Sequence, residues 1–253
     1  MRNKGLRSRW WVWLGGSIGV AICMALGMWQ LDRAAQKTQW QAAMQAQAMQ
    51  PALDAVGVQV AMVQPAAQWV HRPVRLQGQW LAEHLVYLDN RQMQGQPGFY
   101  VLTALLLEDG AAVMVQRGWV GRNFHQRADT PAVETPTGLV QVQGVLAQGP
   151  ARLWSLQEGD GVDPAMPHIR QNLDIQAYSA THQLPLWPLM VVEQGPDSQG
   201  LKRAWPQVHS KTATHYGYAA QWFAIAAVLA GMLLWFHWPR PRKKALHHVA
   251  QQP

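Results

Sequence analysis

Histidines are the first residues to test for chemistry, because the chain has ten of them and only one cysteine. No two of them have the HExxH spacing of a zinc-binding helix, and none has a carboxylate nearby at ligand spacing. The lone Cys23 excludes disulfides, CxxC redox sites and thiolate zinc sites. Serine-hydrolase, phosphate-loop and dinucleotide motifs are absent too. These patterns predict a protein that is not an enzyme and has no metal site built from several side chains.

His215 differs from the other histidines because it begins a long apolar stretch, residues 215–238. Tyr218 and Trp222 follow it at helical spacing and extend the same region of a helix surface. A neutral imidazole at a membrane surface can coordinate a haem iron, and aromatic neighbours can cover the ring. The alternative is an interfacial histidine without a ligand, and the residues alone leave both readings open.

Two stretches are long and apolar enough to cross a membrane. Residues 10–31 and 215–238 each match the ~30 Å hydrocarbon layer at about 1.5 Å per residue. We expect the first to be an uncleaved helix rather than a signal peptide, because no small-x-small cleavage site follows it. Each has a stripe of small residues, which predicts antiparallel packing of the two helices. The stripes are Gly15, Gly19, Cys23 and Gly27 in the first, and Ala220, Ala224, Ala227 and Gly231 in the second.

The net charge of +7 is concentrated in the two tails. Residues 1–9 and 239–253 carry four basic side chains each, which leaves 13 basic against 14 acidic residues between them. This is the positive-inside pattern of a membrane protein, not the basic surface of a nucleic-acid binder. It predicts two cytoplasmic tails, a central domain at 32–214 on the opposite side, and a bacterial inner membrane with this domain in the periplasm.

Polar residues at the outer end of the first span would share a membrane surface with His215 in an antiparallel pair. Arg33 and Lys37 could bind lipid phosphates or a haem propionate. Gln221 needs a hydrogen-bond partner near the membrane, so we expect it to face the first helix.

The central domain alternates apolar and polar residues in several short segments, which predicts antiparallel strands. A Gln-rich segment before them, 34–50, has helical composition and predicts a stalk that ends at Pro51. We expect an α+β membrane protein whose two helices flank one β-rich domain, an antiparallel barrel-like or curved sheet. Strands are expected at 70–80, 85–89, 99–107, 112–120, 139–146 and 189–193, with a short helix at 173–182 and a hairpin turn at 108–110. A strand end and turn are expected at 89–91, and loops at 122–138 and 157–167.

Five motifs follow one another along almost the whole chain. They are Gly27-x-Trp29-Gln30-x-x-Arg33-x-x-x-Lys37, Arg72-Pro73-Val74-Arg75-x-x-Gly78, Asn90-Arg91 with 97–103, Val113-x-Val115-x-Arg117-Gly118-Trp119-Val120, and His215-x-x-Tyr218-Ala219-x-Gln221-Trp222-Phe223. In this order they resemble the surfeit-locus family of cytochrome c oxidase assembly factors. Two positions depart from the family pattern: the asparagine usual two residues before the histidine is Ala213, and the proline usual after the fourth motif is Gly121.

The resemblance implies a non-enzymatic factor that helps mature subunit I of haem–copper oxidases and assists haem a insertion. By position, His215 matches the histidine proposed in the family as a haem ligand. The resemblance also implies contacts with oxidase subunit I, with haem a synthase and with lipids, and it makes Arg117, Gly118 and Trp119 candidate docking residues. Two alternatives remain: a purely structural chaperone that holds subunit I without haem, and a membrane-tethered periplasmic enzyme.

Overall fold

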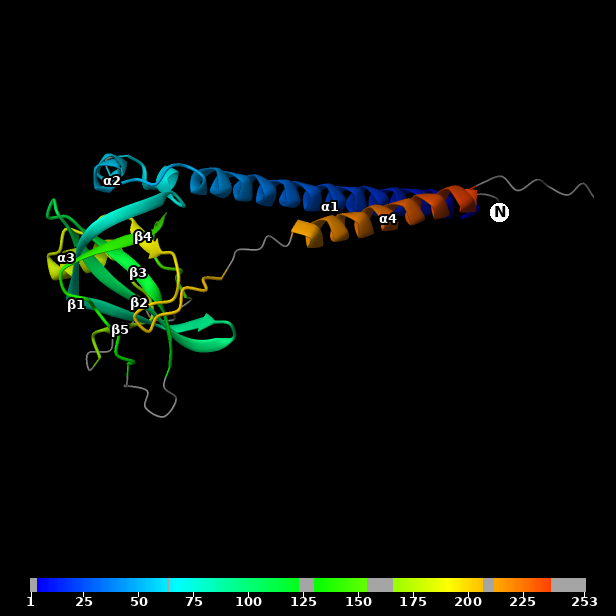
Figure 1. Ribbon diagram of the computed structural model, residues 1–253. Coiled ribbons are helices and arrows are strands. Elements are labelled where there is room, and N and C mark those ends of the chain that lie inside the picture. The colour runs from blue at the N-terminus through cyan, green and yellow to red at the C-terminus, as the bar shows by residue number, and fades with distance from the viewer. Residues whose placement is uncertain (1–3, 63, 123–129, 154–165, 207–211, 238–253) are drawn as a thin grey trace, which may run out of the picture. The chain divides into compact units, whose positions relative to one another are not determined.

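The computed structural model describes residues 4–62, 64–122, 130–153, 166–206 and 212–237 (Figure 1). Contacts divide the chain into two compact units. The helical unit comprises residues up to Gln41 together with those from His209 onward, and the domain spans Ala42–Val208. Each unit is described by itself below.

Two long helices form the helical unit. Helix α1 runs over Lys4–Ala48 and α4 over Thr212–His237. Both contain segments long and apolar enough to span a membrane, at 10–48 and 212–236, and only 11% of each apolar window is buried. Apolar side chains therefore face outward, which suits lipid rather than a water-soluble core. The predicted stalk is helical but continues α1 without a break, because residues 28–48 contain neither glycine nor proline.

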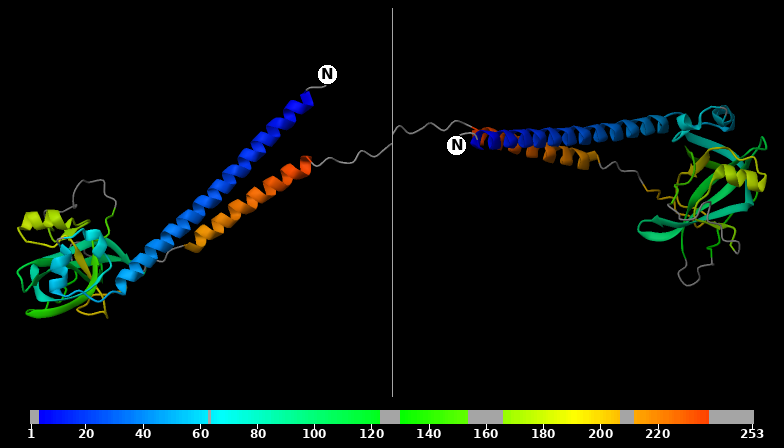
Figure 2. Two further views of the ribbon diagram at one scale, coloured as in Figure 1. Left: turned by 90° about the horizontal axis from the view of Figure 1, so that it is seen from above. Right: turned by 180° about the vertical axis from the view of Figure 1, so that it is seen from behind.

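The two helices lie side by side and antiparallel, as predicted (Figure 2). A Cβ built at Gly16 would lie 2.5 Å from the Leu233 side chain, and one at Gly27 would lie 2.5 Å from the Phe223 ring. Large side chains of α4 thus pack against glycines of α1. This packing allows the two helix backbones to approach closely.

The predicted stripe of α4 is wrong, because its four small residues are exposed. The packed face carries Ala219 and Ala226, each no more than 3% exposed, and Phe223 between them. On α1, Gly19, Cys23 and Gly27 do lie toward α4, whereas Gly16 takes the place predicted for Gly15. The error has a physical cause: the space beside the glycines of one helix is filled by large side chains of the other helix, not by a second row of small residues.

Replacing Gly27 with leucine should destabilise the helix pair by about 1–3 kcal/mol, because the added side chain overlaps the Phe223 ring. Gly15→Leu is the matched control, since a Cβ there meets nothing within 4 Å. The measurement is the detergent-denaturation midpoint of the full chain. Equal midpoints for the two variants would contradict the packing.

The domain is built on a mixed sheet in the order β2-β3-β6-β4-β1-β5, and β1 also pairs with β2. The first strand in this order, β2, is thereby joined to β1, which also pairs with β4. The strands are β1 (Pro73–Met93), β2 (Gln96–Leu107), β3 (Ala112–Gly121), β4 (Leu139–Ala147), β5 (Ile169–Arg170) and β6 (Met190–Glu193), and the helices are α2 (Ala55–Met62), the 3₁₀ helix η1 (Ala66–Trp69) and α3 (Ile175–His182).

Most predicted strands are confirmed, but three expectations were wrong. The segments predicted at 70–80 and 85–89 form one strand, β1. The turn expected at 89–91 lies inside β1, where Asn90 has φ +59° beside a register shift. The sheet is not wholly antiparallel, since β3–β6 and β1–β5 pair parallel. Long connections precede β5 and β6, and such connections allow a strand to return in the parallel sense.

The hairpin turn between β2 and β3 is confirmed, with Gly110 at φ +84°. Alternation along the first half of β1 is confirmed too: Val74 and Leu76 are buried, whereas Arg75 and Gln77 are exposed. The predicted loop at 122–138 lies partly outside the described residues, as does most of the one at 157–167. Helices α2 and η1 and strand β5 were not predicted.

Candidate functional site

His215, in the first turn of α4, is held by two side chains of α1. Its Nδ1 lies 2.8 Å from Gln30 Oε1, and its Nε2 lies 2.8 Å from Lys37 Nζ. Gln30 and Lys37 are seven residues apart, two helical turns, so they stand on one face of α1 and reach the ring from opposite sides. The imidazole orientation is therefore fixed by both ring nitrogens.

A shallow pocket of about 440 Å³ surrounds this histidine. Arg33 and Lys37 supply two cations, and Trp29 and Trp40 supply aromatic surface. The Arg33 guanidinium lies 5.9 Å from the centre of the Trp29 ring and donates from Nη1 to Gln36 Oε1 at 3.2 Å. The lining residues are Trp29, Arg33, Gln36, Lys37, Trp40 and His215.

The structure thus brings together five of the predicted residues: Trp29, Gln30, Arg33, Lys37 and His215. The other three from α4 do not line the pocket. Tyr218 is half exposed, Trp222 is partly buried, and Gln221 is exposed rather than turned toward α1, so that prediction was wrong. Sequence reasoning missed Gln36 and Trp40, although both follow Trp29 and Arg33 at helical spacing.

The donor set of this pocket suits a planar, anionic ligand that carries a metal. His215 lines the pocket, two cations can pair with carboxylates, and tryptophan rings offer flat apolar contact. Elsewhere in the described part of the chain, no group of three or more His, Cys, Asp or Glu side chains is placed to hold a bare metal ion.

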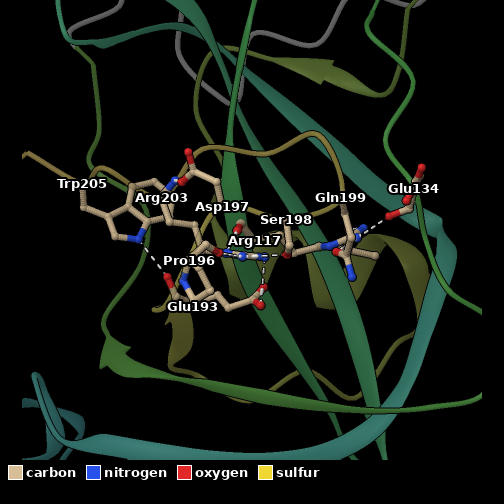
Figure 3. Close-up of polar contacts among 10 residues, drawn as sticks. Arg117, Glu134, Glu193, Pro196, Asp197, Ser198, Gln199, Arg203 and Trp205 are labelled. Carbon is tan, nitrogen blue, oxygen red and sulfur yellow. Dashed lines mark hydrogen bonds and ion pairs between the residues drawn. The ribbon is translucent and has the colours of Figure 1, made fainter.

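Arg117, Gly118 and Trp119 lie inside the domain, on β3. The Arg117 side chain is fully buried, and its ring partner is Trp80, 4.6 Å from the guanidinium carbon to the ring centre. Its Nη2 donates to the Glu134 carbonyl at 2.5 Å and to Gln199 Oε1 at 2.6 Å (Figure 3). Burial lowers the pKa of Arg117 to about 10. This arginine therefore ties two irregular segments to the sheet, and it has no exposed surface for a partner.

Gly118 and Trp119 fix the segment that follows β6. A Cβ at Gly118 would lie 2.5 Å from the Leu201 side chain, so only glycine allows this approach. Trp119 exchanges two backbone hydrogen bonds with Lys202 and donates from its indole nitrogen to the Arg91 carbonyl at 2.9 Å. These contacts make the Arg-Gly-Trp string structural, because it anchors residues 199–203.

Arg203 completes this anchor with a buried ion pair. Its Nη2 lies 3.0 Å from Glu193 Oε1, and its Nε donates to the Arg117 carbonyl at 2.8 Å (Figure 3). Burial raises the pKa of Glu193, whereas the positive charges of Arg203 and Arg117 act in the opposite direction. Arg203 thus pairs with this carboxylate, and Arg117 acts on it electrostatically, so removal of Arg203 leaves Glu193 without its ion-pair partner.

Replacing Arg203 with methionine should destabilise the domain by about 3–5 kcal/mol, because Glu193 is left buried and unpaired. Hydrogen–deuterium exchange of β3 and β6 peptides in the full chain measures the loss. Lys202→Met is the matched control: this neighbour is exposed, and its ammonium nitrogen lies over the face of the Trp119 ring, 5.7 Å from the ring centre. Equal protection in both variants would refute the role of the ion pair.

The same variant should lose stability as the pH rises. A folded-state carboxyl pKa above its unfolded value favours the folded state at low pH, and this contribution is lost as the pH rises through the folded pKa. Because removal of Arg203 takes away a charge that lowers the Glu193 pKa, the loss should be larger at neutral than at acidic pH. The double variant Arg203→Met/Glu193→Gln should lack this difference, and a difference that persists would point to another group.

Two apolar helices long enough to cross a membrane, a mixed β-sheet domain and a histidine pocket define a membrane-associated α+β protein. The model of the SURF1 family matches residues 18–227, which include most of both helices, the whole domain and all the site residues. The chain belongs to the SURF1 family, a family linked to cytochrome oxidase assembly.

Curated relatives agree with this assignment. A SURF1-like protein of Rickettsia felis is 26% identical over 218 residues, which cover 84% of this chain and 90% of the relative. A SURF1-like protein of Rickettsia bellii is 25% identical over 214 residues, which cover 82% and 83%. The similarity therefore extends over nearly the full length of each protein.

Proposed function

We propose that this protein assists the insertion of haem a into subunit I of a haem–copper cytochrome c oxidase, and that it holds the haem as cargo at the His215 pocket. The observation that carries the proposal is the position of His215. Gln30 orients the ring through Nδ1, which turns Nε2 toward a pocket that also contains Arg33 and Lys37. In metal sites, a hydrogen bond between the other ring nitrogen and a neighbouring group orients a histidine ligand in the same way.

Each part of the pocket has a separate task in this proposal. His215 Nε2 would hold the iron, and Arg33 and Lys37 would pair with the propionates. Trp29 and Trp40 would cover the apolar ring from α1. Held in this way, haem stays beside the membrane, and the protein acts by binding and release without catalysing a reaction.

The proposed location is a bacterial inner membrane, with both basic tails in the cytoplasm and the domain in the periplasm. The charge of the tails supports this orientation. We also propose that the sheet works as a closed, barrel-like body, which is supported by the pairing of β1 with both β2 and β4. Such a body offers a rigid surface to oxidase subunit I or to haem a synthase.

A second candidate function is a structural chaperone that holds subunit I without haem. The observation that favours it is the contact of Lys37 with Nε2, which already satisfies the nitrogen that would coordinate iron. In this alternative, the pocket stabilises the end of the helix pair and oxidase assembly depends on the helices and the domain alone.

His215→Ala should abolish the haem absorption band of protein purified from cells that make haem a, without lowering protein yield. His182→Ala is the matched control, because this histidine is exposed on α3 in the domain. The measurement is the optical absorption spectrum of the wild type and of both variants. A band lost only in His215→Ala supports haem delivery, and no band in any sample supports the structural chaperone. A band that survives in His215→Ala would refute this residue as the ligand.

A further inference from the structure

Lys37 and His215 form the most unusual polar contact of the helical unit, because a lysine and a histidine are both basic. A lysine ammonium has only hydrogens to offer, so the 2.8 Å contact requires a lone pair on Nε2. The ring then carries its hydrogen on Nδ1 and donates it to Gln30 Oε1, which lies 2.8 Å away. The two contacts together select one neutral tautomer of His215.

This tautomer is the one that a metal needs at Nε2, yet Lys37 occupies the same lone pair. Coordination by Nε2 and the hydrogen bond from Lys37 therefore exclude each other. Lys37 is exposed and its ammonium stands on a flexible four-carbon stem, so it can leave the ring without disturbing the helices. Gln30 contacts the opposite nitrogen, and its hydrogen bond can persist in both states.

We infer that Lys37 is an exchangeable latch on His215: it covers Nε2 in the empty protein, and it releases Nε2 to pair with a carboxylate of the incoming haem. Gln30 is the positioning residue that keeps Nε2 ready in either state. This inference rests on the proposed function for its second half, whereas the first half concerns the empty protein alone.

Arg33 provides the comparison within the same pocket. Its side chain contacts Gln36 and the Trp29 ring, and neither contact involves His215. Both cations can pair with an anionic ligand, but only Lys37 covers Nε2. Variants that remove one cation at a time therefore separate a general attraction of anions from the latch.

The first test uses the full chain in detergent without haem. Diethyl pyrocarbonate modifies the free lone pair of a neutral imidazole, and mass spectrometry follows the rate at His215 with His182 as internal reference. Lys37→Met should speed modification of His215 by about threefold to tenfold, the worth of one hydrogen bond. Arg33→Met should leave the rate unchanged. Equal rates in the wild type and Lys37→Met would overturn the latch, whatever the protein does with haem.

The second test compares haem with its propionate dimethyl ester in optical titrations. Lys37→Met should bind the ester more tightly than the wild type, because nothing competes for Nε2 and no propionate charge is lost. It should also favour the ester over the free acid more than the wild type does. Arg33→Met should share the second effect but not the first. Ester binding that is unchanged in Lys37→Met would overturn the exchange, and failure of all proteins to bind either compound would refute the proposed function while leaving the first test valid.

Discussion

The site depends on one packing constraint, the insertion of large α4 side chains into the glycine face of α1. Phe223 at Gly27 and Leu233 at Gly16 set both the separation and the register of the two helices. In lipid, close van der Waals packing rather than hydrophobic burial holds such a pair together. The register places the first turn of α4 opposite Gln30 and Lys37, so the chemistry at His215 follows from contacts deeper in the helix pair.

A different principle holds the domain together. Arg203 pairs with the Glu193 carboxylate, and both Arg117 and Arg203 donate hydrogen bonds to carbonyl and side-chain oxygens of the segments 134–135 and 196–199. Buried charge is costly unless it is paired and hydrogen-bonded, so this network tolerates one arrangement of the chain and rejects others. It fixes the segment after β6, which is the part of the domain that leads toward α4 in the sequence.

The two units therefore depend on different kinds of contact. In the helical unit, apolar shape complementarity positions a small polar group of three side chains. In the domain, a buried polar group positions irregular backbone on an apolar sheet. The Arg-Gly-Trp string contributes to the polar contacts of the domain, and its arginine and tryptophan side chains are buried out of reach of a partner.

Sequence alone determined the features that depend on local pattern. Apolar length predicted the two helices and alternation predicted most strands. An antiparallel arrangement of the spans predicted that Arg33 and Lys37 lie at the same membrane surface as His215. Tertiary structure decided the features that depend on volume and on distant partners. Four such features are the packed face of α4, the outward position of Gln221, the two parallel strand pairs and the burial of Arg117. Each of them is set by what lies opposite in space rather than by neighbours along the chain. The contact of Lys37 with Nε2 is of the same kind: both residues were visible in the sequence, but only the helix register shows that one covers the lone pair of the other.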